Sequence, residues 1–97
     1  VKPTEKKYAK HIYHLYVIRS KKRDQLKEFL TKNNIGVGLH YLMPIHLQSA
    51  YSSLGYKTGS FPVSEKLARE ILSLPMSSEH EAEEIEYVCS KIMEASK

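Results

Sequence analysis

Asn34-Ile-Gly-Val-Gly-Leu-His-Tyr-Leu-Met-Pro-Ile-His-Leu-Gln-Ser-Ala-Tyr51 is the stretch that decides the fold, because it begins as a strand and ends as a loop that displays two histidines. Side chains alternate between the two faces of a strand, so Val37, Leu39 and Tyr41 are expected on one face. All three are apolar or aromatic, and we expect this face to pack against the core.

The opposite face of the same strand is nearly bare. It carries Gly36, Gly38 and His40, and glycine leaves room for a ligand or another domain to approach the backbone. Pro44 then ends the strand, and His46 follows in irregular chain. An ordinary weak strand with glycines at a bend and surface histidines explains the same residues equally well.

The remaining elements alternate between helix and strand. Apolar spacing and capping residues predict a strand over 11–20, a helix from an N-cap at Ser20 to Lys32, a short helical turn over 48–54, a helix that begins at Pro62, a strand over 73–74 and a helix after Ser78. We therefore expect an α+β fold, with a small sheet of about three strands and helices packed mainly on one face. Residues 1–10 are lysine-rich and aperiodic, which predicts a linker or flexible lead-in before a single domain over 11–97.

Three local predictions concern the helices. Glu65 and Arg69 are expected to form an outward i, i+4 pair. The Ser78-x-x-Glu81 sequence predicts a capping box at the start of the last helix. Cys89 falls on the apolar stripe of that helix, which favours a place in the core.

Composition limits the class of protein. The chain has 97 residues and a net charge of +4, which suits one domain. A single cysteine excludes an internal disulfide and a cysteine-rich metal site, and it fits a reducing, cytoplasmic location. No apolar run approaches the roughly 18 residues of a membrane span, and no signal-peptide pattern is present, so no membrane partner is expected. The basic first third could meet nucleic acid, phosphate or an acidic partner, or it could be a solvated face.

The central stretch also resembles a known enzyme family. Residues 36–51 are similar to the GI-x-HYP-x-P-x-H-x-Q-x-A-Y segment of the DegT/StrS-type sugar aminotransferases, which use pyridoxal phosphate (PLP) to aminate nucleotide-linked keto sugars. Leu42 departs from this pattern, which usually has proline there, and Ser49 stands at a position where proline is common in the family. Further family motifs follow in order along the chain, namely His14-Leu-Tyr-Val-Ile-Arg-Ser with Arg23-Asp24, Phe61-Pro62-x-x-Glu65, Leu72-Ser-Leu-Pro-Met76 and Ile85-x-x-Val88.

The resemblance covers only the small C-terminal domain of that family, the domain found in fold-type I PLP-dependent aminotransferases. It implies a missing N-terminal PLP domain, a homodimer for the full-length enzyme and a nucleotide-sugar substrate for polysaccharide or amino-sugar biosynthesis. His40, Tyr41 and His46 match positions at the substrate cleft. By this resemblance His40 is a donor to the sugar or pyrophosphate, while strand alternation points Tyr41 toward packing and His46 either shapes the loop or touches ligand.

The chain alone lacks the chemistry of transamination. That reaction needs a partly desolvated lysine for the internal aldimine, a partner for the pyridine nitrogen and donors for the phosphate. All twelve lysines are expected in the tail, in loops, on polar helix faces or at the C-terminus. We therefore expect no catalytic, cofactor-binding or metal-binding residue here, with PLP bound only by the full-length enzyme and this chain inactive alone.

Two other functions stay open. A small basic α+β domain could bind single-stranded nucleic acid through Tyr13 and Tyr16, although a strand would place these rings on opposite faces, which makes nucleic acid an unfavoured partner. The second open function is that of a protein-interaction domain whose partner is a homologous large domain on another chain. The aminotransferase interpretation predicts an exposed apolar patch, expected on the first strand.

Overall fold

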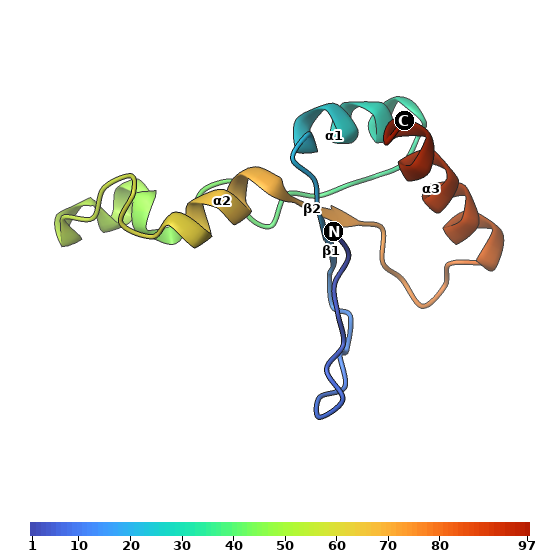
Figure 1. Cartoon of the computed structure of the whole chain (residues 1–97), viewed down its shortest axis with the longest axis horizontal. Coiled ribbons are helices and arrows are strands. Elements are labelled where there is room, and N and C mark those ends of the chain that lie inside the picture. The colour runs from blue at the N-terminus through green and yellow to red at the C-terminus, as the bar shows by residue number, and fades with distance from the viewer.

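The computed structural model describes residues 1–97 and shows a small body from which two segments project (Figure 1). Its elements in order are β1 (Tyr16–Arg19), α1 (Arg23–Lys32), the 3-10 turns η1 (Ile45–Leu47) and η2 (Ser49–Leu54), α2 (Pro62–Glu70), β2 (Ile71–Leu74) and α3 (Ala82–Ala95). The body holds β1, β2, α1 and α3. We call residues 40–70, which contain both 3-10 turns and α2, the arm. The α+β class is confirmed.

The shape is extended for a chain of this length. The radius of gyration is 15.6 Å, against about 13 Å for a compact domain of 100 residues. Only nine of the 97 residues are buried. Much apolar surface is therefore left open, chiefly because the arm points away from the body (Figure 1).

The sheet has two strands rather than about three. β1 and β2 are antiparallel, with Tyr16 opposite Leu74 and Arg19 opposite Ile71. The glycine-containing segment that follows α1 adds only one bridge to the sheet. In it the N–H of Gly38 donates to the carbonyl of Ser73 at 2.9 Å, and the carbonyl of Gly38 accepts the N–H of Ser73 at 2.8 Å. Glycines contribute no side-chain packing to a sheet, which accounts for the short pairing.

The first strand is also shorter than the sequence predicts, since it begins at Tyr16 rather than at His11. The backbone of Tyr13 has φ of 50°, which interrupts the extended conformation before β1. The rings of His11 and Tyr13 stack at 4.3 Å, and those of Tyr13 and Tyr16 at 5.7 Å. The expectation that Tyr13 and Tyr16 lie on opposite faces is therefore wrong, because it assumed an unbroken strand.

One cluster forms the core. Its buried side chains come from β1, α1, the chain just after α1, and β2: Ile18, Leu26, Leu30, Ile35 and Leu72. Burial of each large aliphatic side chain contributes about 1.5–3 kcal/mol. Val37 and Leu39 pack against this cluster, as their strand positions predict, and α3 adds Val88 and Ile92.

The two ends of α1 form differently. The N-cap position is Lys22, and the Ser20 hydroxyl accepts a hydrogen bond from the N–H of Lys22 at 3.1 Å, so the predicted cap lies two residues too early. At the other end Asn33 is the C-cap and Asn34 has φ of 58°, in the left-handed region. This agrees with the turn that the two asparagines predict.

The last helix differs in two details from what the sequence predicts. Its capping box joins Glu81 and Glu84 rather than Ser78 and Glu81. α3 contacts α1, and its Tyr87 hydroxyl donates to the carbonyl of Asn33 at 3.2 Å. Cys89 is exposed, contrary to the prediction, because only the side of α3 that carries Val88 and Ile92 meets the core.

Two arginines fix the junction between the arm and the body. α2 continues into β2 without a loop. The buried Arg23 guanidinium donates to the carbonyls of Ala68 and Ile71, at 3.1 and 3.2 Å. Arg19 pairs with Glu70 at 2.7 Å. These contacts hold the end of α2 against α1 and β1, and so set the direction in which the arm leaves the body.

The N-terminal segment contains no helix or strand before β1, and it forms the second projection in Figure 1. Its first residue returns to the sheet, where the amino group of Val1 donates to the carbonyl of Arg19 at 2.7 Å. None of the helices combines the length and apolar character that crossing a membrane requires.

Candidate functional site

His40 stands where the glycine segment leaves the sheet and the arm begins. Its Nδ1 lies 2.9 Å from the Ser73 hydroxyl, so β2 holds one edge of the ring while the residue as a whole stays exposed. The ring folds back over Gly38: a Cβ on Gly38 would stand 2.5 Å from Cε1 of His40. The glycine face of this segment is therefore covered at Gly38 by the ring of His40.

Tyr41 points away from the core. It is 72% exposed, and its ring meets the His40 ring edge-on at 5.6 Å. The expectation that Tyr41 packs inward with Val37 and Leu39 is wrong, because the regular pairing of this segment ends at Gly38 and alternation does not extend further.

His46 lies in η1 and faces α2. Its Nε2 donates to Oε1 of Glu65 at 2.9 Å, and the two side chains are only 8% and 7% exposed. Its ring packs on Phe61, with centroids 4.8 Å apart. Of the two alternatives for His46, this contact supports a part in shaping the loop.

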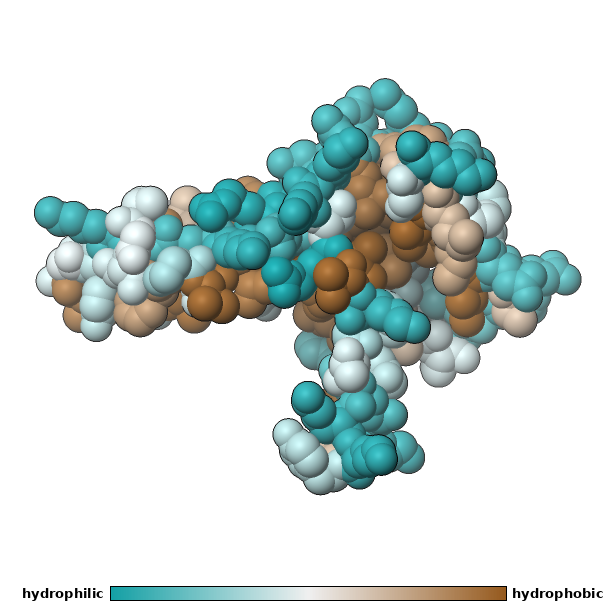
Figure 2. All heavy atoms as spheres, viewed as in Figure 1, coloured by the Kyte–Doolittle hydropathy of each residue, from teal (hydrophilic) through white to brown (hydrophobic).

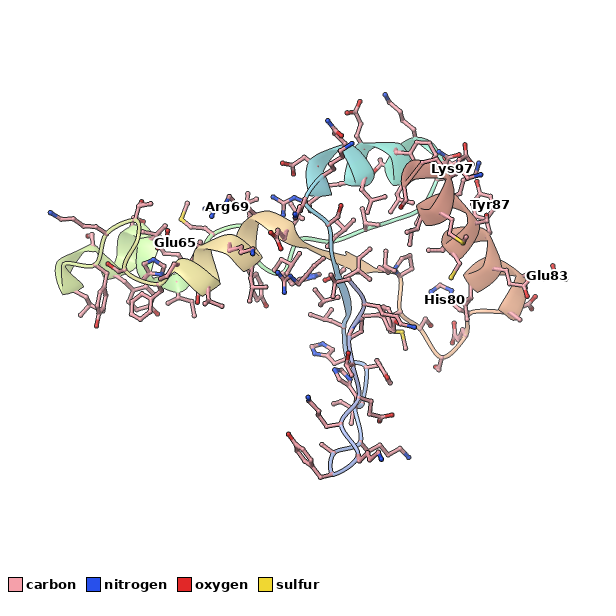
Figure 3. All side chains as sticks on the ribbon, in the orientation of Figure 1. Glu65, Arg69, His80, Glu83, Tyr87 and Lys97 are labelled. Carbon is pink, nitrogen blue, oxygen red and sulfur yellow. The ribbon has the colours of Figure 1, made fainter.

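Glu65 is the residue that the sequence missed. We expected an outward pair with Arg69, yet both project from α2 (Figure 3) and only Arg69 is exposed. Both carboxylate oxygens of Glu65 accept the N–H of Gly59, at 2.8 and 3.0 Å, and Oε1 also accepts the N–H of Phe61 at 3.3 Å. The signal was present in the Phe61-Pro62-x-x-Glu65 motif, where a glutamate one turn into a helix can reach back to its start.

The electrostatics of this cluster favour an ionised carboxylate. Burial acts to raise the pKa of Glu65, but the hydrogen bonds from His46 and from the backbone N–H groups of Gly59 and Phe61 outweigh it. The pKa of Glu65 is therefore held below its ordinary value.

A groove of about 580 Å³ runs along the arm beside this cluster. Tyr41 and His46 line it, whereas His40 does not. The other lining residues are mostly apolar: Met43, Pro44, Ile45, Gln48, Tyr51, Leu54, Tyr56, Phe61, Ser64, Leu67, Ala68 and Ile71. In Figure 2 hydrophobic residues gather along one edge of the arm, and hydrophilic residues cover the other.

The exposed apolar surface is only partly where the sequence predicted it, on the strand expected over 11–20. Ile18 of β1 is buried, whereas Ile12, in the N-terminal projection, is 87% exposed. Further exposed apolar side chains lie on the arm and on α3, for example Ile45 at 69% and Met93 at 68%. A second groove of about 860 Å³ lies between the end of β2 and α3. The exposed apolar surface is therefore divided among the N-terminal projection, the arm and the C-terminal helix.

Comparison with known proteins identifies the family to which the chain is similar. Residues 1–93 match the model of the DegT/DnrJ/EryC1/StrS aminotransferase family. The chain belongs to this family. It is 46% identical over 94 residues to a pleiotropic regulatory protein of Geobacillus stearothermophilus, covering 97% of this chain and 25% of that protein. It is 38% identical over 90 residues to the dTDP-3-amino-3,6-dideoxy-alpha-D-galactopyranose transaminase of Aneurinibacillus thermoaerophilus, covering 93% and 24%.

A solved structure of the same family agrees over nearly the whole chain. DesV of S. venezuelae, in complex with a ketimine intermediate, superposes with a TM-score of 0.89 at 29% identity, covering 99% of this chain and 26% of that one. Within the DegT/DnrJ/EryC1/StrS family, this chain therefore spans about a quarter of the length of the relatives it matches.

None of the twelve lysines of this family member is buried. The buried polar side chains are Arg23, Glu65 and Ser73, and no lysine is among them. A Schiff-base lysine must be partly desolvated to be nucleophilic at neutral pH. No group of three His, Cys, Asp or Glu side chains is placed to hold a metal ion.

Proposed function

We propose that this chain is the C-terminal small domain of a PLP-dependent aminotransferase that acts on nucleotide-linked keto sugars. The observation that carries the proposal is the family match over residues 1–93, together with the superposition on DesV over 99% of the chain. The transaminase names of relatives such as the Aneurinibacillus protein support the substrate class.

In this proposal the Schiff-base lysine and PLP belong to a large N-terminal domain. The exposed apolar surface of the arm and α3 supports such a partner, since a stable soluble surface rarely leaves so many large side chains open. We also propose, from the family resemblance, that the complete enzyme is a homodimer. A single cysteine that forms no disulfide supports a cytoplasmic location.

The chain's own contribution is to bind and orient the sugar nucleotide. His40 is held by Ser73 through Nδ1, which leaves Nε2 free to reach a sugar or phosphate oxygen. Tyr41 offers an exposed hydroxyl at the arm groove. The apolar side chains of the groove exclude water from one wall of the cleft.

A nucleic-acid function gains no support from the aromatic residues. His11, Tyr13 and Tyr16 stack on one another, with centroids 4.3 and 5.7 Å apart. Ring faces that cover each other leave no open platform on which successive bases can stack.

The proposal is tested with the complete gene product that contains these 97 residues. We expect it to purify with a pyridoxal absorbance and to transfer an amino group to a nucleotide-linked keto sugar. His40→Ala should raise KM for the sugar nucleotide and leave the cofactor absorbance intact. A product that lacks pyridoxal absorbance after incubation with PLP would refute the proposal.

A further inference from the structure

Glu65 and His46 form a buried hydrogen-bonded contact that joins α2 to η1 within the arm. The Nε2–Oε1 distance is 2.9 Å, and each side chain is less than a tenth exposed. The sequence pattern assigned Glu65 to an outward position and no role in a site. Its burial against His46 means that the carboxylate acts directly on the histidine ring.

The contact decides which ring nitrogen carries the proton. An ionised carboxylate only accepts hydrogen bonds, so a nitrogen at 2.9 Å from Glu65 must be an N–H donor. A neutral imidazole has one N–H and one lone-pair nitrogen. Because Nε2 holds the proton, Nδ1 of neutral His46 is left as an acceptor.

A second observation concerns the other ring nitrogen of His46, a residue that lines the arm groove. The hydrogen bond of His46 runs through Nε2, and no buried side-chain nitrogen or oxygen of the chain lacks a partner. Nδ1 is therefore not sealed in the interior, and His46 lines the arm groove, whose wall is mainly apolar. A lone acceptor on an apolar wall attracts a hydrogen-bond donor and disfavours an anionic oxygen.

We propose that Glu65 is a positioning residue that holds His46 in the Nε2–H tautomer, so that the arm groove receives a hydroxyl of the ligand at Nδ1 rather than a phosphate. The same carboxylate accepts the N–H groups of Gly59 and Phe61, so it fixes the loop and the histidine together. Only the identity of the ligand as a nucleotide sugar rests on the proposed function. The tautomer follows from the contact alone.

The tautomer is tested by NMR of the complete gene product with 15N-labelled histidine, at a pH where the ring is neutral. Loss of one signal set in His46→Gln assigns the residue. We expect an Nε2–H and a lone-pair Nδ1 for His46 in the wild-type protein. An Nδ1–H tautomer of the neutral ring would overturn the proposal.

Two variants separate positioning from general damage. In Glu65→Gln the amide can face His46 with its NH₂ group, so we expect the Nε2–H population of His46 to fall severalfold. Glu84→Gln is the matched control: Glu84 contacts the partly exposed His80 at 3.2 Å on α3, and its substitution should leave the His46 signals unchanged. An unchanged His46 tautomer in a folded Glu65→Gln protein would show that Glu65 does not set it.

The ligand class is tested with dTDP-glucose and inorganic pyrophosphate as probes. We expect dTDP-glucose to move the Nδ1 shift of His46 and pyrophosphate to leave it unchanged. A response to pyrophosphate alone would overturn the hydroxyl assignment. A response to neither would remove His46 from the ligand site and overturn the hydroxyl assignment, while the tautomer result and the roles of His40 and Tyr41 in the proposed function would stand separately.

Discussion

The imidazole of His40 lies directly over Gly38, so that a Cβ on Gly38 would approach Cε1 of His40 to 2.5 Å. The same ring is tied to the Ser73 hydroxyl at 2.9 Å. Gly38 itself pairs with the backbone of Ser73. Gly38, two residues earlier, and Ser73, 33 residues later in the chain, thus fix the histidine at the root of the arm. The glycine is needed because the ring occupies the place of a side chain.

Gly38→Ala should displace the His40 ring and break its contact with Ser73. The buried Ser73 hydroxyl then loses a partner, which costs about 1–2 kcal/mol in the free energy of unfolding. Urea denaturation of the 97-residue chain measures this cost. Gly36→Ala is the control, since a Cβ there meets nothing within 4 Å, and equal losses in both variants would contradict the account.

Arg23→Met should weaken the junction between the arm and the body. The carbonyls of Ala68 and Ile71 lose a charged donor in a buried setting, and the expected loss is about 3 kcal/mol in the free energy of unfolding. Arg69→Met, at an exposed position of α2, should change it by less than about 0.5 kcal/mol. A small effect of Arg23→Met would show that α2 is held by other contacts.

Leu72→Ala should destabilise the chain by about 2–5 kcal/mol, because Leu72 is fully buried between β1 and α1 and the truncation leaves a cavity. Leu54→Ala removes the same atoms from a side chain that is 62% exposed, and its effect should be close to zero. Thermal and urea unfolding compare the two. Similar losses would mean that the arm groove is as well packed as the core.

Acid should weaken the arm through Glu65. The folded pKa of Glu65 is lowered, mainly by bonds that outweigh burial, so its contribution is present above the ordinary value of about 4.5 and is lost as the pH falls below it. Glu65→Gln should therefore make the stability of the chain less dependent on pH in the acid range. Glu86→Gln, at an exposed position of α3, is the control, and its acid profile should follow that of the wild type.

Much of the fold could be predicted where local chemistry decides it. Pro62 begins α2 and the asparagines end α1, because both signals act within one turn. Glu65 could not be placed by helical spacing, since its partners His46 and Gly59 come from loops whose path no periodicity reveals. Cys89 was misplaced because its helix is amphipathic by pattern, while only part of the apolar stripe meets the core.

The site was predicted in part. The histidines of the central stretch do stand at the arm, yet the same alternation that placed Val37 and Leu39 correctly failed at Tyr41. A two-residue period holds only while the ladder continues, and here it ends at Gly38. Whether His40, Tyr41 and His46 touch substrate stays a prediction.

The most direct measurement maps the lysine that forms the Schiff base. The complete gene product is incubated with PLP, reduced with borohydride, digested and examined by mass spectrometry. We expect the pyridoxyl group on a lysine outside these 97 residues, and none of the twelve lysines described here to be labelled stoichiometrically. Stoichiometric labelling of one of these twelve would show that the chain carries its own catalytic lysine and would contradict the account.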